Sequence, residues 1–156
     1  MEFSQLPLSF EGKVEREHLD FLGHMNVMWY THLFDRATWG FYEGFGFGQD
    51  YHQGDKGSFA LEMYTRYLAE VRLNDSFKVY TRAIARSKKL FHFMHFMVRE
   101  RDGELSATCE MLGIHIDMRT RLSNEMPDEL ATAWDKLIEA HNKLGWDALI
   151  SGVMSP

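Results

Sequence analysis

Asp20 and His24 are the two residues of this 156-residue chain whose types and spacing best suit chemistry at a carbonyl group. They fall in a compact loop, residues 19–26, just before a candidate helix whose N-cap is Asn26. The start of a helix offers unpaired backbone N–H groups and positive potential, which suit a carbonyl oxygen that gains negative charge. A nearby carboxylate could attack that carbonyl or activate water to do so. The plainer alternative is that Asp20 only forms an Asx turn and that His24 donates to the backbone.

Other residues with reactive side chains occur in patterns typical of structure. His92 and His95 are three apart in a candidate strand, which places them on opposite faces, and no third ligand stands at a recognised metal spacing. The lone Cys109 excludes an intramolecular disulfide and a cysteine-based zinc site, and we expect it in the core. Ser123 lacks a nucleophile elbow, and the glycine run 44–48 lacks the strand that precedes a dinucleotide-binding loop. The sequence therefore predicts no metal site.

A long helix from Val27 to Glu43 follows the loop and must position it. Apolar residues recur at helical spacing, and further apolar residues beside them extend the apolar surface until only a narrow polar stripe is left. That stripe consists of His32, Asp35, Arg36 and Glu43. A helix that is apolar over most of its circumference is expected to be buried. Glycines at 44, 46 and 48 end it.

The rest of the chain reads as antiparallel sheet followed by one more helix. Apolar and aromatic stretches bounded by turn signals, with a period of two over 77–86, predict strands over 10–18, 58–71, 77–86, 90–99 and 105–118. We also expect a polar loop over 49–57, turns at 73–75 and 101–103, and an amphipathic helix over about 128–144. A nearly all-apolar helix needs cover on several sides. The order of elements therefore predicts an α+β fold in which one long helix is wrapped by a curved antiparallel sheet of about five strands.

The composition indicates one globular domain over residues 1–156. The chain has 17 Lys and Arg against 23 Asp and Glu, a net charge of −6 that argues against nucleic acid as the main partner. Glu2 and Pro7 stand where a signal peptide would have cations followed by an unbroken apolar stretch. No apolar run approaches the ~20 residues that span a bilayer. We therefore expect a cytoplasmic protein without a membrane partner. The 12 Phe and 10 Met suit a bulky apolar pocket or an oligomer interface, and equally a large core.

The string from Asp20 to Tyr30 resembles the signature of hotdog-fold acyl-CoA thioesterases, above all the 4-hydroxybenzoyl-CoA thioesterase-like group. That signature has an Asp, a Gly three residues later, a Tyr ten residues later, and then an aromatic and a small residue along the helix, here Phe34 and Ala37. The resemblance extends over about residues 10–127 and includes the turn at 74–75, the basic segment 87–89 and Pro127. It implies a single hotdog domain with a C-terminal helix.

The resemblance also implies hydrolysis of an acyl-CoA thioester without a metal or redox cofactor. Asp20 takes the place of the catalytic carboxylate, as nucleophile or general base. The backbone N–H near Val27 would polarise the carbonyl, and His24 and Asn26 would orient water or the loop. Some relatives carry His or Tyr in place of Val27, so only the backbone amide is useful here. The implied substrate-binding residues are Gly23, Trp29, Tyr30 and Tyr64, with Lys88 and Lys89 placed where related enzymes hold the phosphates of CoA.

A finer resemblance concerns the acyl group. The string 23–27, together with His92, His95, Glu110, His115 and Asp117, is similar to thioesterases that act on betainyl-type CoA esters. A trimethylammonium group favours aromatic faces, which could come from Trp29, Tyr30, Phe59 and Tyr64. The alternative is an aromatic-rich interior that holds an ordinary short acyl chain.

Two other functions and an assembly state follow from the hotdog resemblance. The first is a non-catalytic acyl-CoA-binding protein, which would need no carboxylate at the carbonyl. The second is hydration of enoyl-CoA, which uses an Asp and a His five apart in a longer motif with Asn-Pro. Here Asp20 and His24 are four apart and that motif is absent. Because this fold usually completes its active site between two subunits, we expect a homodimer or homotetramer.

Overall fold

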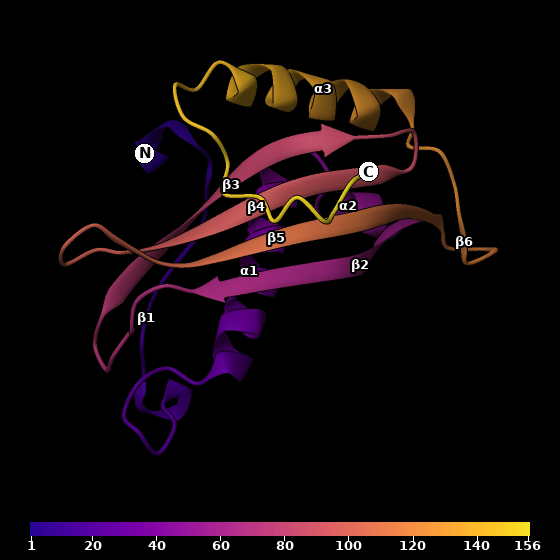
Figure 1. Cartoon of the computed structure of the whole chain (residues 1–156). Coiled ribbons are helices and arrows are strands. Elements are labelled where there is room, and N and C mark those ends of the chain that lie inside the picture. Colours follow the sequence, from indigo (N-terminus) through magenta and orange to yellow (C-terminus); the bar gives the residue numbers. More distant parts are fainter.

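A curled antiparallel sheet with a long helix against one face organises the molecule (Figure 1), and the computed structural model describes all 156 residues. The elements in chain order are the 3-10 helix η1 (Phe3–Gln5), β1 (Leu8–Lys13), the 3-10 helix η2 (Arg16–His18), α1 (Val27–Gly44), α2 (Gln49–His52), β2 (Lys56–Tyr67), β3 (Ser76–Arg86), β4 (Leu90–Arg99), β5 (Glu104–Asp117), β6 (Leu122–Ser123) and α3 (Asp128–Asn142). The strand order is β1-β3-β4-β5-β2, all pairs are antiparallel, and the short β6 pairs with β5. The predicted α+β arrangement is confirmed.

Two predictions of local structure are wrong. The first strand does not run over 10–18, because the chain turns into η2 after β1. In that turn the Glu15 N–H donates to Nδ1 of His18 at 3.0 Å. The stretch 49–57 is not only a loop, because it holds the single turn of α2 and the first residues of β2. Inside α2, Nδ1 of His52 lies 2.9 Å from the Gly48 carbonyl oxygen, which stabilises a turn too short to show a period.

Helix α1 begins at the predicted residue and is buried on one side. Its inward face consists of Tyr30, Leu33, Phe34, Ala37, Thr38, Phe41 and Tyr42. Besides the predicted polar stripe, however, Val27, Met28 and Trp39 are exposed. The expectation that α1 is buried over most of its circumference is thus wrong for a single chain, since the sheet covers only one side of the helix.

Helix α3 and the C-terminal tail close the sheet on two further sides (Figure 1). The second half of β3 extends beyond β1, and the Ala83 N–H there donates to Nδ1 of His141 in α3 at 2.9 Å. After α3 the chain crosses the sheet face opposite α1, where Trp146 packs against Phe96 and its carbonyl oxygen accepts from Arg82 at 2.7 Å.

His92 and His95 lie on opposite faces of β4, as predicted. On the outer face, Nε2 of His92 lies 2.8 Å from a carboxylate oxygen of the fully buried Glu110. The other oxygen of Glu110 accepts the Ser151 N–H of the tail at 2.6 Å. Cys109 is buried, also as predicted. The outer face therefore carries a buried contact between a histidine and a glutamate, covered by the end of the chain.

His95 faces α1 in a chain of buried hydrogen bonds. Thr38 donates its hydroxyl to the Phe34 carbonyl at 3.0 Å, so its oxygen accepts from Nε2 of His95 at 2.9 Å. Nδ1 of His95 then accepts from the Thr81 hydroxyl at 2.8 Å, and Thr81 lies 2.5 Å from the Ser9 hydroxyl. Burial lowers the pKa of His95 from 6.5 to about 3. The neutral imidazole thus links α1 to β3 and β1.

Candidate active site

The loop before α1 and the end of β2 line a cavity of about 480 Å³. Its lining consists of Asp20, His24, Met25, Asn26, Val27, Tyr30, Tyr67, Leu68, Ala69 and Glu70. A larger hollow of about 730 Å³ lies along the second half of α1, but only two of its ten lining residues are hydrophobic. The smaller cavity is the better candidate, because it combines a carboxylate, a helix start and mostly apolar walls.

The loop is held in shape by its own backbone and by the β2–β3 connection. Asp20 donates its N–H to the His24 carbonyl at 3.0 Å, and Gly23 donates to the Asp20 carbonyl at 3.2 Å. Gly23 has a φ of 87°, a conformation that favours glycine. The Met25 N–H donates to the Val71 carbonyl at 2.9 Å, which ties the loop to the segment after β2. Gly23 therefore shapes the turn and does not line the cavity.

The two oxygens of the Asp20 carboxylate have different partners. Oδ1 accepts the Leu22 N–H at 2.8 Å, which is the Asx turn considered as the plainer alternative. Oδ2 lies 3.5 Å from Nδ1 of His24. The turn thus fixes the carboxylate through one oxygen, and the second oxygen faces His24 at the cavity wall.

The first turn of α1 leaves one backbone donor free. The N-cap Asn26 accepts the Met28 N–H on its side-chain oxygen at 3.0 Å and the Trp29 N–H on its carbonyl at 3.0 Å. The Val27 N–H donates to no protein atom, and Val27 is 59% exposed. A free donor at a helix start, beside a carboxylate, can stabilise negative charge on a bound carbonyl oxygen.

The end of β2 contributes residues that the sequence alone did not indicate. The rings of Tyr30 and Tyr67 meet edge to face, with centroids 5.0 Å apart at 76°. Burial raises the pKa of Tyr30 to about 12, with smaller contributions from Tyr67 and Glu70, so Tyr30 remains a neutral phenol. The hydrogen bonds from Arg72 lower the pKa of Glu70, which keeps that carboxylate charged. Only the pairing of β2 with the rest of the sheet brings these residues to Asp20.

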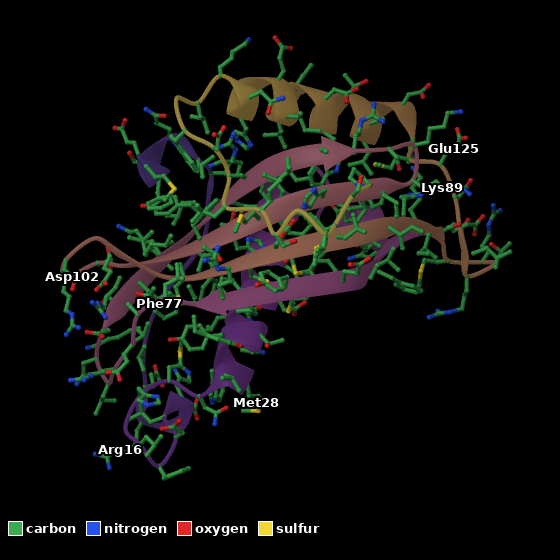
Figure 2. The ribbon with its side chains drawn as sticks, in the orientation of Figure 1. Arg16, Met28, Phe77, Lys89, Asp102 and Glu125 are labelled. Atoms are coloured by element: carbon green, nitrogen blue, oxygen red, sulfur yellow. The ribbon has the colours of Figure 1, made fainter.

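Besides Gly23, four of the predicted binding residues lie outside this cavity within one chain. The Trp29 ring packs against His18 and His32, with centroids 4.3 and 5.4 Å away. Tyr64 lies in the middle of β2, opposite Glu110 of β5. The remaining two are Lys88 and Lys89 in the β3–β4 turn, whose Nζ atoms lie 3.2 Å from Glu125 and 3.4 Å from Ser123. Figure 2 shows Lys89 far from Met28 in the first turn of α1.

Residues 14–134 match the family model of the Thioesterase-like superfamily. The chain belongs to this superfamily. The family expected from the sequence is therefore confirmed. No group of three His, Cys, Asp or Glu side chains is placed to hold a metal ion. None of the helices in this thioesterase-like chain combines the length and apolar character needed to cross a bilayer.

Curated relatives of this superfamily member include betainyl-CoA thioesterases. It is 30% identical over 127 residues to the L-carnitine dehydrogenase/betainyl-CoA thioesterase of Agrobacterium fabrum. The aligned residues make up 81% of this chain and 26% of that protein. The chain thus spans about a quarter of the length of that relative. It is 25% identical over 142 residues to the betainyl-CoA thioesterase of Pseudomonas aeruginosa, which covers 90% of this chain and 89% of that protein.

Solved structures confirm the hotdog fold of this thioesterase-like chain. A Staphylococcus aureus protein in complex with CoA superposes with a TM-score of 0.82 at 25% identity, covering 91% of this chain and 90% of that one. The DHNA-CoA thioesterase of Staphylococcus aureus superposes with a TM-score of 0.78 at 19% identity, covering 86% of this chain and 92% of that one.

Proposed function

We propose that this protein hydrolyses acyl-CoA thioesters to the free acid and CoA. The observation that carries the proposal is that Asp20 and Val27, whose backbone N–H is free at the start of α1, line the same cavity. Two classes of relative support the choice of substrate. Curated relatives are named betainyl-CoA thioesterases, and a protein of the same fold binds CoA.

The proposed reaction uses each of these groups once. The thioester carbonyl oxygen accepts the Val27 N–H, which stabilises the charge that forms when the carbonyl carbon is attacked. Asp20 either attacks that carbon itself or takes a proton from the water that attacks it. The carbon–sulfur bond then breaks. If Asp20 acts as a base, the proton that it took from water passes to the sulfur, and the free acid and the CoA thiol leave. If Asp20 attacks, CoA leaves as a thiolate that takes up a proton from water, and a water molecule then hydrolyses the acyl–Asp20 anhydride to release the free acid and restore the carboxylate. His24 holds the carboxylate, and Asn26 holds the helix start. The reaction as proposed uses no metal or redox cofactor.

A second copy of the chain is part of the proposal. One edge of β2 pairs with β5 and the other is unpaired, and this strand exposes large apolar side chains. They are Phe59, Leu61, Met63, Tyr64 and Tyr67. An unpaired apolar edge of this length is normally covered. In one chain, moreover, Lys88 and Lys89 stand at the opposite end of the strands from Tyr67, so we propose that they bind CoA phosphates at the site of a second subunit. Light scattering at micromolar concentration should give a dimer or tetramer mass, and a stable monomer contradicts this arrangement.

The experiment that tests the proposed function is the substitution Asp20→Asn. Asn keeps a side-chain oxygen for the Leu22 N–H but cannot act as a nucleophile or base, so the loop remains folded. We expect kcat for acyl-CoA hydrolysis to fall by at least about a hundredfold, with little change in KM. CoA release is followed with a thiol-reactive dye.

Asp50→Asn is the matched control, because Asp50 is an exposed carboxylate in α2 that lies outside the cavity. It should leave kcat unchanged. Retention of turnover in Asp20→Asn would show that Asp20 only forms the turn. Binding of acyl-CoA by the wild type without any CoA release would favour a non-catalytic acyl-CoA-binding protein.

A further inference from the structure

The candidate cavity has an unusual distribution of charge. Its ten lining residues include two carboxylates, Asp20 and Glu70, and neither Lys nor Arg. Arg72 lies outside the lining and pairs with Glu70 through one oxygen only, because its Nε and Nη2 atoms both donate to Oε2, at 3.0 and 2.6 Å. The other oxygen, Oε1, accepts from no protein donor. A carboxylate oxygen without a protein donor thus remains at this wall, apart from those of Asp20.

Aromatic rings stand beside that carboxylate. Tyr30 is 4% exposed and Tyr67 is 50% exposed, and their near-perpendicular rings form a corner of the cavity. The face of a tyrosine ring attracts a cation within about 6 Å, most strongly when water is excluded. Two rings at a steep angle with a carboxylate beside them match the shape and charge of a quaternary ammonium group.

The segment that carries Tyr67 and Glu70 is held rigidly. The Leu68 and Ala69 N–H groups donate to the Ser106 carbonyl at 2.9 and 3.1 Å. The buried guanidinium of Arg99 donates to the Glu70 carbonyl oxygen. A preformed wall binds a ligand without the entropic cost of ordering a loop, so the position of Glu70 is set before substrate arrives.

We propose that Tyr30, Tyr67 and Glu70 form a receptor for a positively charged group on the acyl chain, and that this receptor makes the enzyme prefer quaternary-ammonium acyl-CoA esters to neutral esters of the same shape. The inference rests on the proposed function for the cleavage step and adds the residues that select the acyl group. It places the aromatic contacts at Tyr30 and Tyr67, and not at Trp29, Phe59 or Tyr64, which lie outside the cavity.

A pair of isosteric substrates tests the receptor. Betainyl-CoA and 3,3-dimethylbutanoyl-CoA differ only in a quaternary nitrogen in place of a quaternary carbon, so the ratio of their kcat/KM values isolates the charge. We expect a ratio of about ten or more in the wild type, from a partly desolvated cation–aromatic contact. Glu70→Gln and Tyr67→Leu should each reduce the ratio severalfold, whereas Tyr67→Phe, which keeps the ring, should retain it. Glu62→Gln, an exposed carboxylate of β2 outside the cavity, is the matched control and should keep the wild-type ratio.

The outcomes separate this inference from the proposed function. Hydrolysis of both esters at equal kcat/KM, or a ratio that none of the variants changes, overturns the receptor and leaves the thioesterase proposal intact. If neither ester is cleaved, calorimetric titration with tetramethylammonium chloride decides. Binding that weakens in Glu70→Gln and Tyr67→Leu supports the receptor while the proposed function fails, and no binding in the wild type overturns the receptor as well.

Discussion

Because His95 is buried, we expect it to make this protein less stable as the pH falls. In the folded protein its pKa is lowered from 6.5 to about 3 because the ring is fully buried. Between these two values the unfolded chain binds a proton that the folded chain does not, so the free energy of unfolding falls as the pH falls. From pH 7 to pH 4.5 the loss from this one residue is about 2.5 kcal/mol.

The substitution His95→Phe isolates this contribution. Thr38 keeps its bond to the Phe34 carbonyl, and Thr81 keeps its contact with Ser9, so no hydroxyl is left without a partner. The variant loses two hydrogen bonds, which should cost about 2 kcal/mol at pH 7. It also lacks the group whose protonation favours the unfolded chain at low pH, so its stability falls less as the pH falls. We therefore expect the variant to be clearly less stable than the wild type at pH 7 and about equally stable at pH 4.5.

Urea unfolding at several pH values, followed by circular dichroism at one fixed protein concentration, measures this difference. Burial also lowers the pKa values of His115 and His141, but these residues remain in both proteins and cancel in the comparison. Phe91→Leu, on the same face of β4 but without a ring contact to His95, is the control and should lose the same stability at every pH. Parallel pH curves for the wild type and His95→Phe would refute the reasoning.

Two further predictions concern packing and CoA binding. A Cβ on Gly40 would lie 2.0 Å from the Ser9 carbonyl oxygen, so Gly40→Ala should force α1 away from β1 and cost about 3 kcal/mol, seen as a lower Tm, whereas Gly44→Ala, with open space around it, should not lower Tm. Equal melting temperatures for the two variants would contradict the close packing. Replacing both Lys88 and Lys89 with Ala should raise KM for acyl-CoA, more so at low salt, and leave KM for a thioester without the nucleotide unchanged. An equal rise for both substrates would exclude a contact with the phosphates.

The sequence predicted the elements that have a local cause. Asn26 caps α1 through its own side chain, and β3 shows a period of two along the chain. The strands β4 and β5 were predicted from their apolar runs and from the hairpin turn between them. The approach of Tyr67 and Glu70 to Asp20 was not predictable in this way, because it depends on how the end of β2 meets the loop before α1. The burial of Glu110 under the tail was not predictable either, because its contact with the Ser151 N–H joins residues far apart in the sequence and nothing around Ser151 indicates it.

The free N–H at the start of α1 belongs to the backbone, and its position is set by the helix and not by the identity of residue 27. Selection can therefore change the side chain of Val27, and with it the mouth of the cavity, without losing the donor. A comparison of residue types therefore cannot detect this donor. Proline is the one exception, because it alone lacks the N–H, and it is well accepted as the first residue of a helix. Asn26 already has the extended conformation, with φ −68° and ψ 144°, that a following proline requires. The fold itself would accept proline at this position, so Val27→Pro would remove the proposed donor while leaving the helix start intact.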